Sequence, residues 1–508
     1  MTVTLLFIAG CASDTTSSPR LDAADRAPVL DPLEVDARLW DAEVRPGLSW
    51  DVVVVGAGPA GLAAAGDAYE AGARVRVLER EDSPGGSANW SGGLVMFSGT
   101  PEQAAAGVTD SPEALLAEWA AITGGDTADP WVRRFAEQNV PMVHDLLVER
   151  GVVFNGPNLD PSAGVTARVH APTTQGPGLV AALVDRVPPA TLRFGAEATS
   201  FAQGVNGRIT GVYWTDRATG QVYLSPARTV IVATGGFLHD LDRVRQERPA
   251  LEGVDLRYAC WPGATGDGLR ALESLGAATE NLDAIGLYAH AVRHPDGQGE
   301  ILLTTLGEAP WVNAHGARFT DESQFRGFPI AEDLAEQPAG EAWIVLDQDD
   351  FARTRAMTVE GEAWTMSDLL EAGVGAEADS LEALAAEHGW DESGFAEEIA
   401  AYNAFARGES ADPWRTAAGA RVIDMPPFYA FPLALSPAKG FGGVDVDDAG
   451  RVLSTEGEVI PGLYAAGELA GMAGGTLVGE LGFTGSLTAV ILGGRVAGTS
   501  AAAEADAR

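Results

Sequence analysis

The hydrophobic pattern of the chain first becomes regular at Trp50. Residues 51–55, DVVVV, contain four consecutive β-branched valines, which predicts a strand buried in a parallel sheet. A glycine-rich stretch, GAGPAG, follows; LAAAGDAYEAGA then predicts a helix and RVRVLER a second strand. Residues 1–47 lack this regularity, and from residue 12 they are polar and rich in Asp and Pro. We expect them to form a leader and a linker.

The later pattern alternates between helical and strand-like regions. Residues 111–150 favour helices, residues 190–235 favour strands that end in ARTVIVATGG, and residues 300–347 mix strands and loops. Residues 365–408 are again helical and acidic, and GLYAAGE at 462–468 predicts a strand and a turn before a long apolar helix. A dinucleotide-binding pattern therefore opens and closes the chain, and a different region interrupts it.

The glycine-rich stretch has the spacing of a dinucleotide fingerprint. It reads Gly56-Ala57-Gly58-Pro59-Ala60-Gly61, which is G-x-G-x-x-G between a strand and a helix. Gly56 permits the tight turn, Gly58 lets the backbone approach a pyrophosphate, and Gly61 lets the helix pack on the strand. The positive end of the helix then stabilises the phosphates. Glu79 ends the second strand at the position that accepts a ribose hydroxyl.

Composition excludes several classes of partner. The 508 residues carry a formal net charge of −39, so no positive surface is available to neutralise the phosphates of a nucleic acid or an anionic membrane. The two cysteines, Cys11 and Cys260, make neither a disulfide framework nor a metal cluster, and we expect no metal. At 46% hydrophobic residues, the chain can bury a large core.

The N-terminal sequence is compatible with two cellular locations. MTVTLLFIAGCASDTTSS resembles the end of a bacterial lipoprotein signal, with Cys11 after a short apolar run. No Lys or Arg precedes this run, although a signal peptide needs a basic start. We therefore expect a cytoplasmic protein, with a lipid-anchored extracytoplasmic lipoprotein as the alternative.

Six motifs in a fixed order resemble one flavoprotein family. GAGPAG, ER at 79–80, GGSANWSGG at 85–93, ATGG at 233–236, GATGDG at 263–268 and GLYAAGE at 462–468 look like the fumarate reductase and succinate dehydrogenase flavoproteins. That family also contains 3-ketosteroid Δ1-dehydrogenases, urocanate reductase and tricarballylate dehydrogenase. The resemblance covers residues 48–508. It implies an α/β fold with a Rossmann-like FAD-binding domain, split into 48–284 and 433–508, and an inserted α+β capping domain at 285–432.

The same resemblance implies a set of FAD contacts. They are Gly56, Gly58, Pro59, Ala60, Gly61, Glu79, Arg80, Gly85, Gly86, Ser87, Gly92, Gly93, Thr234, Gly235, Asp267, Glu468, Gly485, Ser486 and Leu487. Glu468 would hold the sugar chain, and the helix that starts near Leu487 would face the flavin edge that becomes negative on reduction. Relatives with covalent FAD carry a histidine at the position of Gly86, so we expect non-covalent FAD. No second dinucleotide fingerprint appears in the sequence, so we predict no dedicated NAD(P)H site.

The resemblance also implies the chemistry, which is hydride exchange between flavin N5 and a carbon near a carbonyl or carboxylate. The protein must supply a proton carrier and a group that polarises the carbonyl. The stretch RFTDESQFR at 318–326 is similar to the R-F-V-N-E-x-x-x-R pattern of fumarate reductases, whose last arginine carries the proton. This assigns the proton carrier to Arg326; the alternative is an arginine in a surface ion pair.

Three further residues are candidates for the substrate site. His290 lies near a substrate-binding histidine of the relatives, and a purely structural histidine is the alternative. Lys439, the only lysine in the chain, matches a histidine that binds a substrate carboxylate, while the alternative is an exposed lysine at a domain hinge. Glu480 replaces an arginine of the fumarate reductases. Because a carboxylate repels a dicarboxylate, the replacement favours a polar, mono-acid or cationic substrate over fumarate.

The sequence leaves the direction of the reaction open. We expect an enzyme that adds or removes hydrogen across a C–C bond; a ketosteroid-dehydrogenase-like desaturase and a non-catalytic flavin electron-transfer subunit are the alternatives. The desaturases carry tyrosines at positions 326 and 480, and this chain does not. The expected partners are a small-molecule substrate and an external electron donor or acceptor, namely a quinone, a carrier protein or oxygen.

Overall fold

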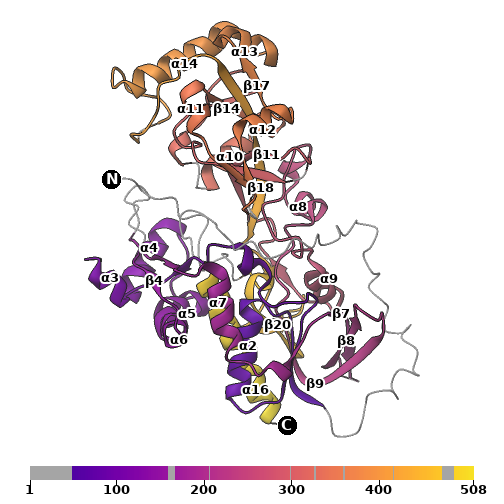
Figure 1. Cartoon of the computed structure of the whole chain (residues 1–508). Helices are drawn as coiled ribbons and strands as arrows, with labels where there is room; N and C mark the ends of the chain where they lie inside the picture. The colour runs from indigo at the N-terminus through magenta and orange to yellow at the C-terminus, as the bar shows by residue number, and fades with distance from the viewer. Residues whose placement is uncertain are drawn as a thin grey trace. The chain divides into compact units, whose positions relative to one another are not determined.

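The computed structural model describes residues 49–157, 166–204, 206–297, 299–324, 328–358, 361–415, 417–471 and 486–507. These residues form two compact units (Figure 1). The larger unit contains residues 49–240, 261–284 and 440–507, and the smaller unit contains residues 241–260 and 285–439. Residues 241–260 thus belong to the unit that holds the insertion, and the chain returns to the larger unit after Lys439.

The larger unit is built on an eight-stranded sheet whose main order is β20-β21-β9-β1-β2-β6. Strands β21, β9, β1, β2 and β6 are parallel, whereas β20, β8 and β7 extend the sheet in antiparallel pairs. The bounds of the sheet are β1 Trp50–Val55, β2 Val75–Leu78, β6 Leu192–Arg193, β7 Ala196–Gln203, β8 Ile209–Asp216, β9 Val222–Val232, β20 Arg451–Leu453 and β21 Val459–Ala465. The four valines of β1 are almost completely buried, as predicted for a central parallel strand.

Helices and short strands complete the larger unit. The helices are α2 Pro59–Glu70, α3 Pro101–Ala105, α4 Pro112–Thr123, α5 Pro130–Gln138, α6 Asp145–Glu149, α7 Gln175–Val184, α9 Asp267–Ser274 and α16 Leu487–Asp506, with a π-helical turn, η4, at Asn139–His144. The 3₁₀ turns are η3 Gly86–Trp90, η6 Pro189–Thr191 and η10 Gly467–Leu469. The short strands are β3 Val95–Met96, β4 Phe154–Asn155, β5 Val169–Pro172, β10 Thr279–Glu280 and β19 Gly443–Val444.

Helices α2 and α16 pack side by side although they lie at opposite ends of the sequence (Figure 1). An added Cβ at Gly494 would come within 2.2 Å of the carbonyl oxygen of Ala60, and one at Gly498 within 2.3 Å of that of Ala64. The two glycines therefore let the helix backbones approach more closely than larger residues would allow. The last helix is in this way fixed against the helix of the glycine motif.

The smaller unit is built on a mostly antiparallel sheet of order β13-β14-β18-β11-β12-β15-β16, with β17 paired to β18. Its strands are β11 Ile285–Arg293, β12 Glu300–Leu303, β13 Trp311–Asn313, β14 Ala342–Leu346, β15 Ala356–Thr358, β16 Ala363–Trp364, β17 Ala376–Ala378 and β18 Phe428–Gly440. Its helices are α8 Leu241–Glu247, α10 Phe328–Ala335, α11 Gln348–Arg353, α12 Met366–Glu371, α13 Leu381–His388 and α14 Glu392–Ala406. The 3₁₀ turns are η7 Pro249–Leu251, η8 Glu322–Gln324 and η9 Pro338–Gly340.

The core of the smaller unit gathers buried aromatic and aliphatic side chains, among them Trp390, Phe395 and Tyr402. Strand and helix thus mix here as expected for an α+β insertion, and the parallel sheet of the larger unit is divided in sequence around it. Within the described ranges, no helix combines the length and apolarity needed to cross a bilayer.

Candidate functional site

The glycine motif forms the turn between β1 and α2. Gly56 has a φ of +100°, and an added Cβ there would lie 2.5 Å from the carbonyl oxygen of Ala233. At Gly61 the added Cβ would lie 1.9 Å from the carbonyl oxygen of Gly56. At Gly58 the nearest described atom would be 4.0 Å away. Gly56 and Gly61 are thus required by the protein itself, whereas the space beside Gly58 is open.

Glu79 fixes this turn from the end of β2. Glu79 is buried, at 7% exposure, and its carboxylate accepts the backbone N–H of Ala57 at 2.6 Å and that of Glu81 at 2.8 Å. Burial raises the pKa of Glu79, although the two backbone hydrogen bonds oppose this effect. The sequence predicted an acceptor for a ribose hydroxyl at this position. The structure places the carboxylate beside the glycine turn, where it also holds the turn in shape.

Three distant motifs converge on the turn after β9. Gly236 faces Glu468, because an added Cβ at Gly236 would lie 2.6 Å from the Glu468 carboxyl carbon. Gly266 donates its N–H to the carbonyl of Gly236 at 3.2 Å. An added Cβ at Gly268, in the first turn of α9, would lie 2.0 Å from the hydroxyl of Thr234. The motifs at 233–236, 263–268 and 462–468 therefore form one surface within the larger unit.

A second convergence joins residues 85–93 to the start of α16. Gly85 donates its N–H to the carbonyl of Ala57 at 2.9 Å, which links η3 to the glycine turn. Ser486 pairs with Val95 of β3, and the N–H of Met96 donates to the hydroxyl of Thr488 at 2.9 Å. The N-terminus of α16 therefore lies against the strand that follows Gly92 and Gly93. The remaining glycines of this region are Gly86, with a φ of +51°, and Gly93, with a φ of +72°.

The fit of a dinucleotide can be tested on groups that the protein leaves unused. The hydroxyl of Thr234 is buried and has no hydrogen-bond partner among the described residues. A buried hydroxyl without a partner costs about 1–3 kcal/mol, so such a group points to a missing ligand. Gly235 has a φ of +80° and no described atom within 4 Å of an added Cβ. Together with the open space at Gly58, these groups fit a bound dinucleotide.

Arg80 and Asp267 form an ionic bridge across this surface. Nη1 of Arg80 lies 3.5 Å from Oδ2 of Asp267, and Nη2 donates to the carbonyl of Gly263 at 3.3 Å. Burial acts to raise the pKa of Asp267, but hydrogen bonds from Thr265 and Arg270 and the positive charges of Arg270 and Arg80 hold it below its ordinary value. The carboxylate therefore stays ionised at neutral pH.

His290 belongs to a hydrogen-bonded group in the smaller unit. Nε2 of His290 lies 3.1 Å from Oε1 of Glu300, and the hydroxyl of Ser436 donates to Oε2 of Glu300 at 2.7 Å. These residues lie on β11, β12 and β18, which are neighbours in the sheet. The Tyr288 ring lies against the imidazole at a centroid distance of 4.6 Å. The imidazole is 22% exposed, while the Glu300 side chain is fully buried.

Of the other predicted substrate residues, the structure describes only Lys439. Lys439 is the penultimate residue of β18 and is partly buried. Arg326 and Glu480, together with Gly485 of the cofactor set, lie outside the described residues. Their predicted roles stay predictions.

The described part of the RFTDESQFR stretch is anchored by a buried ion pair network. Arg318 donates to Glu322 at 2.7 and 2.9 Å and to Asp412 at 2.6 Å, and its guanidinium lies 4.8 Å from the centroid of the Tyr402 ring. Burial alone would lower the pKa of Arg318, but the two carboxylates raise it. Arg318 is therefore a structural cation that fixes the segment leading to Arg326.

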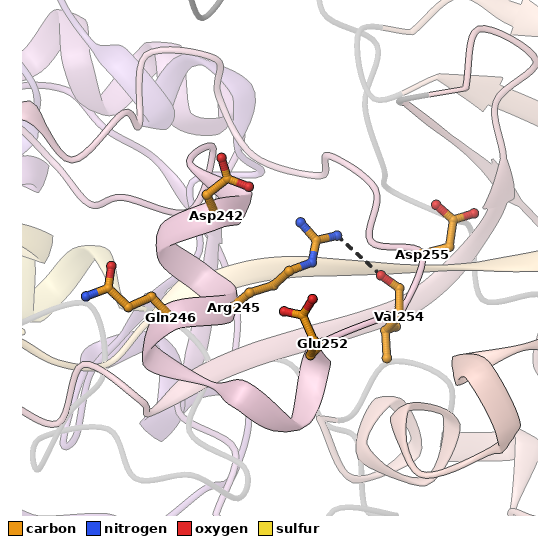
Figure 2. A pocket seen from close by; sticks show the side chains of 7 residues that line it. Asp242, Arg245, Gln246, Glu252, Val254 and Asp255 are labelled. Atoms are coloured by element: carbon orange, nitrogen blue, oxygen red, sulfur yellow. Dashed lines mark hydrogen bonds between the residues drawn. The ribbon is translucent and has the colours of Figure 1, made fainter.

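The smaller unit also contains a cavity of about 730 Å³ (Figure 2). In it, Nη2 of Arg245 donates to the carbonyl of Val254 at 3.3 Å, as the dashed line in Figure 2 marks. The cavity is lined by Asp242, Arg245, Gln246, Glu252, Gly253, Val254 and Asp255. Three carboxylates against one guanidinium suit an anionic substrate poorly, and no predicted site residue lines this cavity.

Sequence reasoning missed the partners of the candidate residues. Glu300 contacts His290 from 10 positions away, and Ser436 contacts Glu300 from 136 positions away. Asp412 contacts Arg318 from 94 positions away. The one available signal was Glu300 itself, an acidic residue at the start of the apolar run EILL. Nothing in the sequence pairs it with a particular histidine.

Comparison with known proteins places these features in a family. A family model described as an FAD binding domain matches residues 51–479, which is most of the chain. The fold is accordingly an FAD-binding α/β fold.

Two characterised reductases are similar along most of their length. A fumarate reductase (cytochrome) of Shewanella frigidimarina is 30% identical over 458 residues, which cover 89% of this chain and 77% of that protein. A urocanate reductase of Eggerthella lenta is 30% identical over 465 residues, which cover 89% of this chain and 74% of that protein.

A solved structure shows the same fold at lower identity. The 3-ketosteroid Δ1-dehydrogenase of Sterolibacterium denitrificans, solved with 1,4-androstadiene-3,17-dione, superposes with a TM-score of 0.74 at 20% identity and covers 91% of this chain and all of that chain. At this identity the likeness concerns the fold alone.

Proposed function

The chain belongs to the FAD binding domain family, and from this premise we propose that it reduces a carbon–carbon double bond conjugated to an acyl group. It is an FAD-dependent oxidoreductase of the fumarate reductase type. The observation that carries the proposal is the match, over 89% of the chain, to two reductases whose named substrates are both conjugated enoates. Since both relatives are named reductases, we assign this chain the reductive direction.

We assign the cofactor to the surface around the glycine turn, with no covalent bond. Bound FAD supplies the hydride for the double bond. The backbone at Gly58 and the start of α2 would hold the pyrophosphate, and Glu79 would accept a ribose hydroxyl beside its contact with Ala57. The hydroxyl of Thr234 is the buried group that would gain a partner. Because Gly86 offers no side-chain atom, FAD should leave the protein on denaturation.

That expectation has a direct test. Acid-denatured protein is removed by centrifugation, and the absorbance of the supernatant is compared with that of the pellet. All yellow colour should appear in the supernatant. Flavin that stays with the pellet would contradict non-covalent attachment.

The chain's own groups then act on the substrate. Arg326 delivers a proton to the carbon next to the one that receives hydride, as the R-F-x-x-E-x-x-x-R spacing of its segment supports. Arg318 keeps that segment in place through its ion pairs with Glu322 and Asp412. His290 and Lys439 bind the acyl oxygen, which becomes negative as hydride is added, so positively charged or N–H donor groups stabilise the transition state.

Reducing equivalents come from outside the chain. The proposed donor is a reduced quinone or a carrier protein, because no second dinucleotide fingerprint is present in the sequence to bind a nicotinamide. The proposal includes no nucleic-acid partner, since a net charge of −39 opposes one.

A spectroscopic assay tests the function as a whole. The purified protein is bleached under argon with reduced viologen, and a panel of enoates and enones is added one at a time. We expect one chemical class to restore the oxidised flavin spectrum and yield the saturated product. A bound flavin that none of them reoxidises would refute the reductase proposal and leave the electron-transfer and desaturase alternatives. The desaturase alternative then predicts that saturated ketones bleach the oxidised flavin.

The role of Lys439 has its own test. Lys439→Arg keeps the charge but replaces a compact ammonium group by a planar guanidinium group, and Lys439→Met removes the charge. If the ammonium binds the acyl oxygen, both variants raise KM, and Met does so more strongly. Equal KM values in all three proteins would place Lys439 outside the substrate site.

A further inference from the structure

Glu300 is a buried acid whose two oxygens are both occupied. Its side chain is fully buried, Oε2 accepts the hydroxyl of Ser436 at 2.7 Å, and Oε1 lies 3.1 Å from Nε2 of His290. An ionised carboxylate only accepts hydrogen bonds, so Nε2 must carry the proton in this contact. The carboxylate thereby fixes the orientation of the ring and leaves Nδ1 as the nitrogen that does not contact Glu300.

The imidazole of His290 lies between buried Glu300 and solvent. The imidazole is 22% exposed, and no hydrogen bond to its Nδ1 occurs within the described residues. A buried carboxylate without a cationic partner is strongly unfavourable, and His290 is the only ion-pair partner of Glu300 within the described residues. The pair is therefore neutral overall when His290 is protonated, and the proton at Nδ1 is then available to a substrate oxygen.

We propose that Glu300 is a positioning residue that restricts the substrate of this enzyme to one without a second carboxylate. Through Nε2, Glu300 directs Nδ1 of His290 toward the acyl oxygen. Because its own charge cancels that of the imidazolium, the pair can stabilise one developing oxyanion but lends no net positive charge to a second carboxylate. The inference rests on the proposed function, and it deepens that function to the reduction of monocarboxylic enoates and enones.

A simple structural role for the pair makes a different prediction. A buried Ser–Glu–His group that only holds β18, β11 and β12 together would affect stability and leave the choice among bound substrates unchanged. A variant that removes the charge of Glu300 but keeps its shape distinguishes the structural role from the role in substrate selection. Glu300→Gln does this, because the amide oxygen can still accept from Nε2 while the amide NH₂ donates to Ser436.

The experiment compares two substrates that differ by one charge. Fumarate and monomethyl fumarate are offered to wild type, to Glu300→Gln, Ser436→Ala and His290→Gln, and to the double variant Glu300→Gln/His290→Gln under the viologen assay. Thr305→Val is the matched control, because Thr305 and Thr354 form another buried hydrogen bond of 2.9 Å in the same unit. Succinate and its monomethyl ester, which cannot be reduced, are titrated against each protein by the change in flavin absorbance.

We expect wild type to prefer the monoester by about tenfold or more in kcat/KM, and Glu300→Gln to lower this preference by about tenfold. Ser436→Ala should raise KM for both substrates and keep the preference, since it leaves the charge in place. Glu300→Gln should change little once His290 is already Gln, because the acid acts through the ring. Thr305→Val should keep wild-type KM values.

Two results would overturn the inference. A wild-type enzyme that prefers fumarate, or a Glu300→Gln variant with lower stability and an unchanged ratio, shows that Glu300 is structural. If no enoate is reduced at all, the proposed function fails, and the titrations still decide the present point. A monoester preference that Glu300→Gln weakens supports charge selection at His290, and equal binding of diacid and monoester in both proteins refutes it.

Discussion

Two glycines of the same motif should respond in opposite ways to the same added methyl group. In Gly61→Ala the new Cβ would lie 1.9 Å from the carbonyl oxygen of Gly56, a backbone atom that cannot rotate away. In Gly58→Ala the nearest described atom would be 4.0 Å away. Gly58 also has φ −72° and ψ 176°, which alanine adopts without strain. The protein thus forbids a side chain at Gly61 and permits one at Gly58.

These distances set the expected magnitudes. Since Cβ atoms do not approach other heavy atoms within about 3.0 Å, α2 must move by about 1 Å to admit a methyl group at Gly61. Overpacking of this kind costs about 1–3 kcal/mol, so the apoprotein of Gly61→Ala should lose that amount of unfolding free energy. For Gly58→Ala, the reduced freedom of the unfolded chain gains about 0.4–1 kcal/mol and the poorer N-cap costs about 0.5–1 kcal/mol, so the apoprotein should be nearly unchanged.

The methyl group at position 58 should therefore change only the affinity for FAD. If the pyrophosphate occupies the open space, the same overpacking penalty of about 1–3 kcal/mol falls on FAD binding, which is about a 5- to 150-fold rise in Kd. Chemical denaturation of the apoproteins and FAD titration followed by flavin fluorescence measure the two quantities separately. Wild-type FAD affinity in Gly58→Ala would refute this placement of the pyrophosphate. Normal apoprotein stability in Gly61→Ala would refute the packing argument.

The remaining predictions concern a proton carrier, an ion pair and a buried hydroxyl. Arg326→Gln should lower the turnover of enoates by about 10²–10⁴-fold with a normal flavin spectrum, whereas Arg355→Gln, a change at an exposed arginine, should not; equal rates would remove Arg326 from the reaction. Asp412→Asn should cost about 3–5 kcal/mol in denaturant unfolding, because it leaves buried Arg318 with one carboxylate fewer. Burial acts to raise the pKa of Asp412, but hydrogen bonds from Arg318 and from the backbone lower it overall, so its contribution is present above about pH 4 and is lost as pH falls further. Urea midpoints of the variant should therefore depend less on pH in the acid range, and an unchanged acid slope would contradict this. Thr234→Val should stabilise the apoprotein by about 1 kcal/mol and weaken FAD binding, since the hydroxyl is buried without a described partner; unaltered FAD affinity would show that water satisfies it.

The features that the sequence predicted well are those set by the backbone. A strand, a G-x-G-x-x-G turn and a helix can be recognised within about twenty residues. Gly56 and Gly61 are required there because an added Cβ would clash with nearby backbone atoms. The helical character predicted for residues 111–150 is confirmed by α4, α5 and α6, and Pro112 and Pro130 occupy the first turns of α4 and α5. The parallel pairing of β1 with β2 follows from the same strand–helix–strand pattern.

What the sequence could not supply are contacts between distant side chains. The predicted helical region 365–408 contains the strand β17, which exists because it pairs with β18 some fifty residues later. The partners of His290 and Arg318 come from strands and loops that no periodicity connects to them. A motif therefore yields candidates for the chemistry, and the structure shows the acids beside His290 and Arg318.

Those acids bear on the kind of substrate that the enzyme can accept. Arg80 lies beside Glu81 and Asp267, Arg318 beside Glu322 and Asp412, and His290 beside Glu300. Each cationic group is thus matched by at least one carboxylate, in a chain whose net charge is already −39. A dianion would have to enter this environment against the field of the whole protein, whereas an enone or a monocarboxylate would meet little opposition. The Glu480 substitution, read from the sequence, and the proposed role of Glu300 both favour a substrate that carries less negative charge than fumarate.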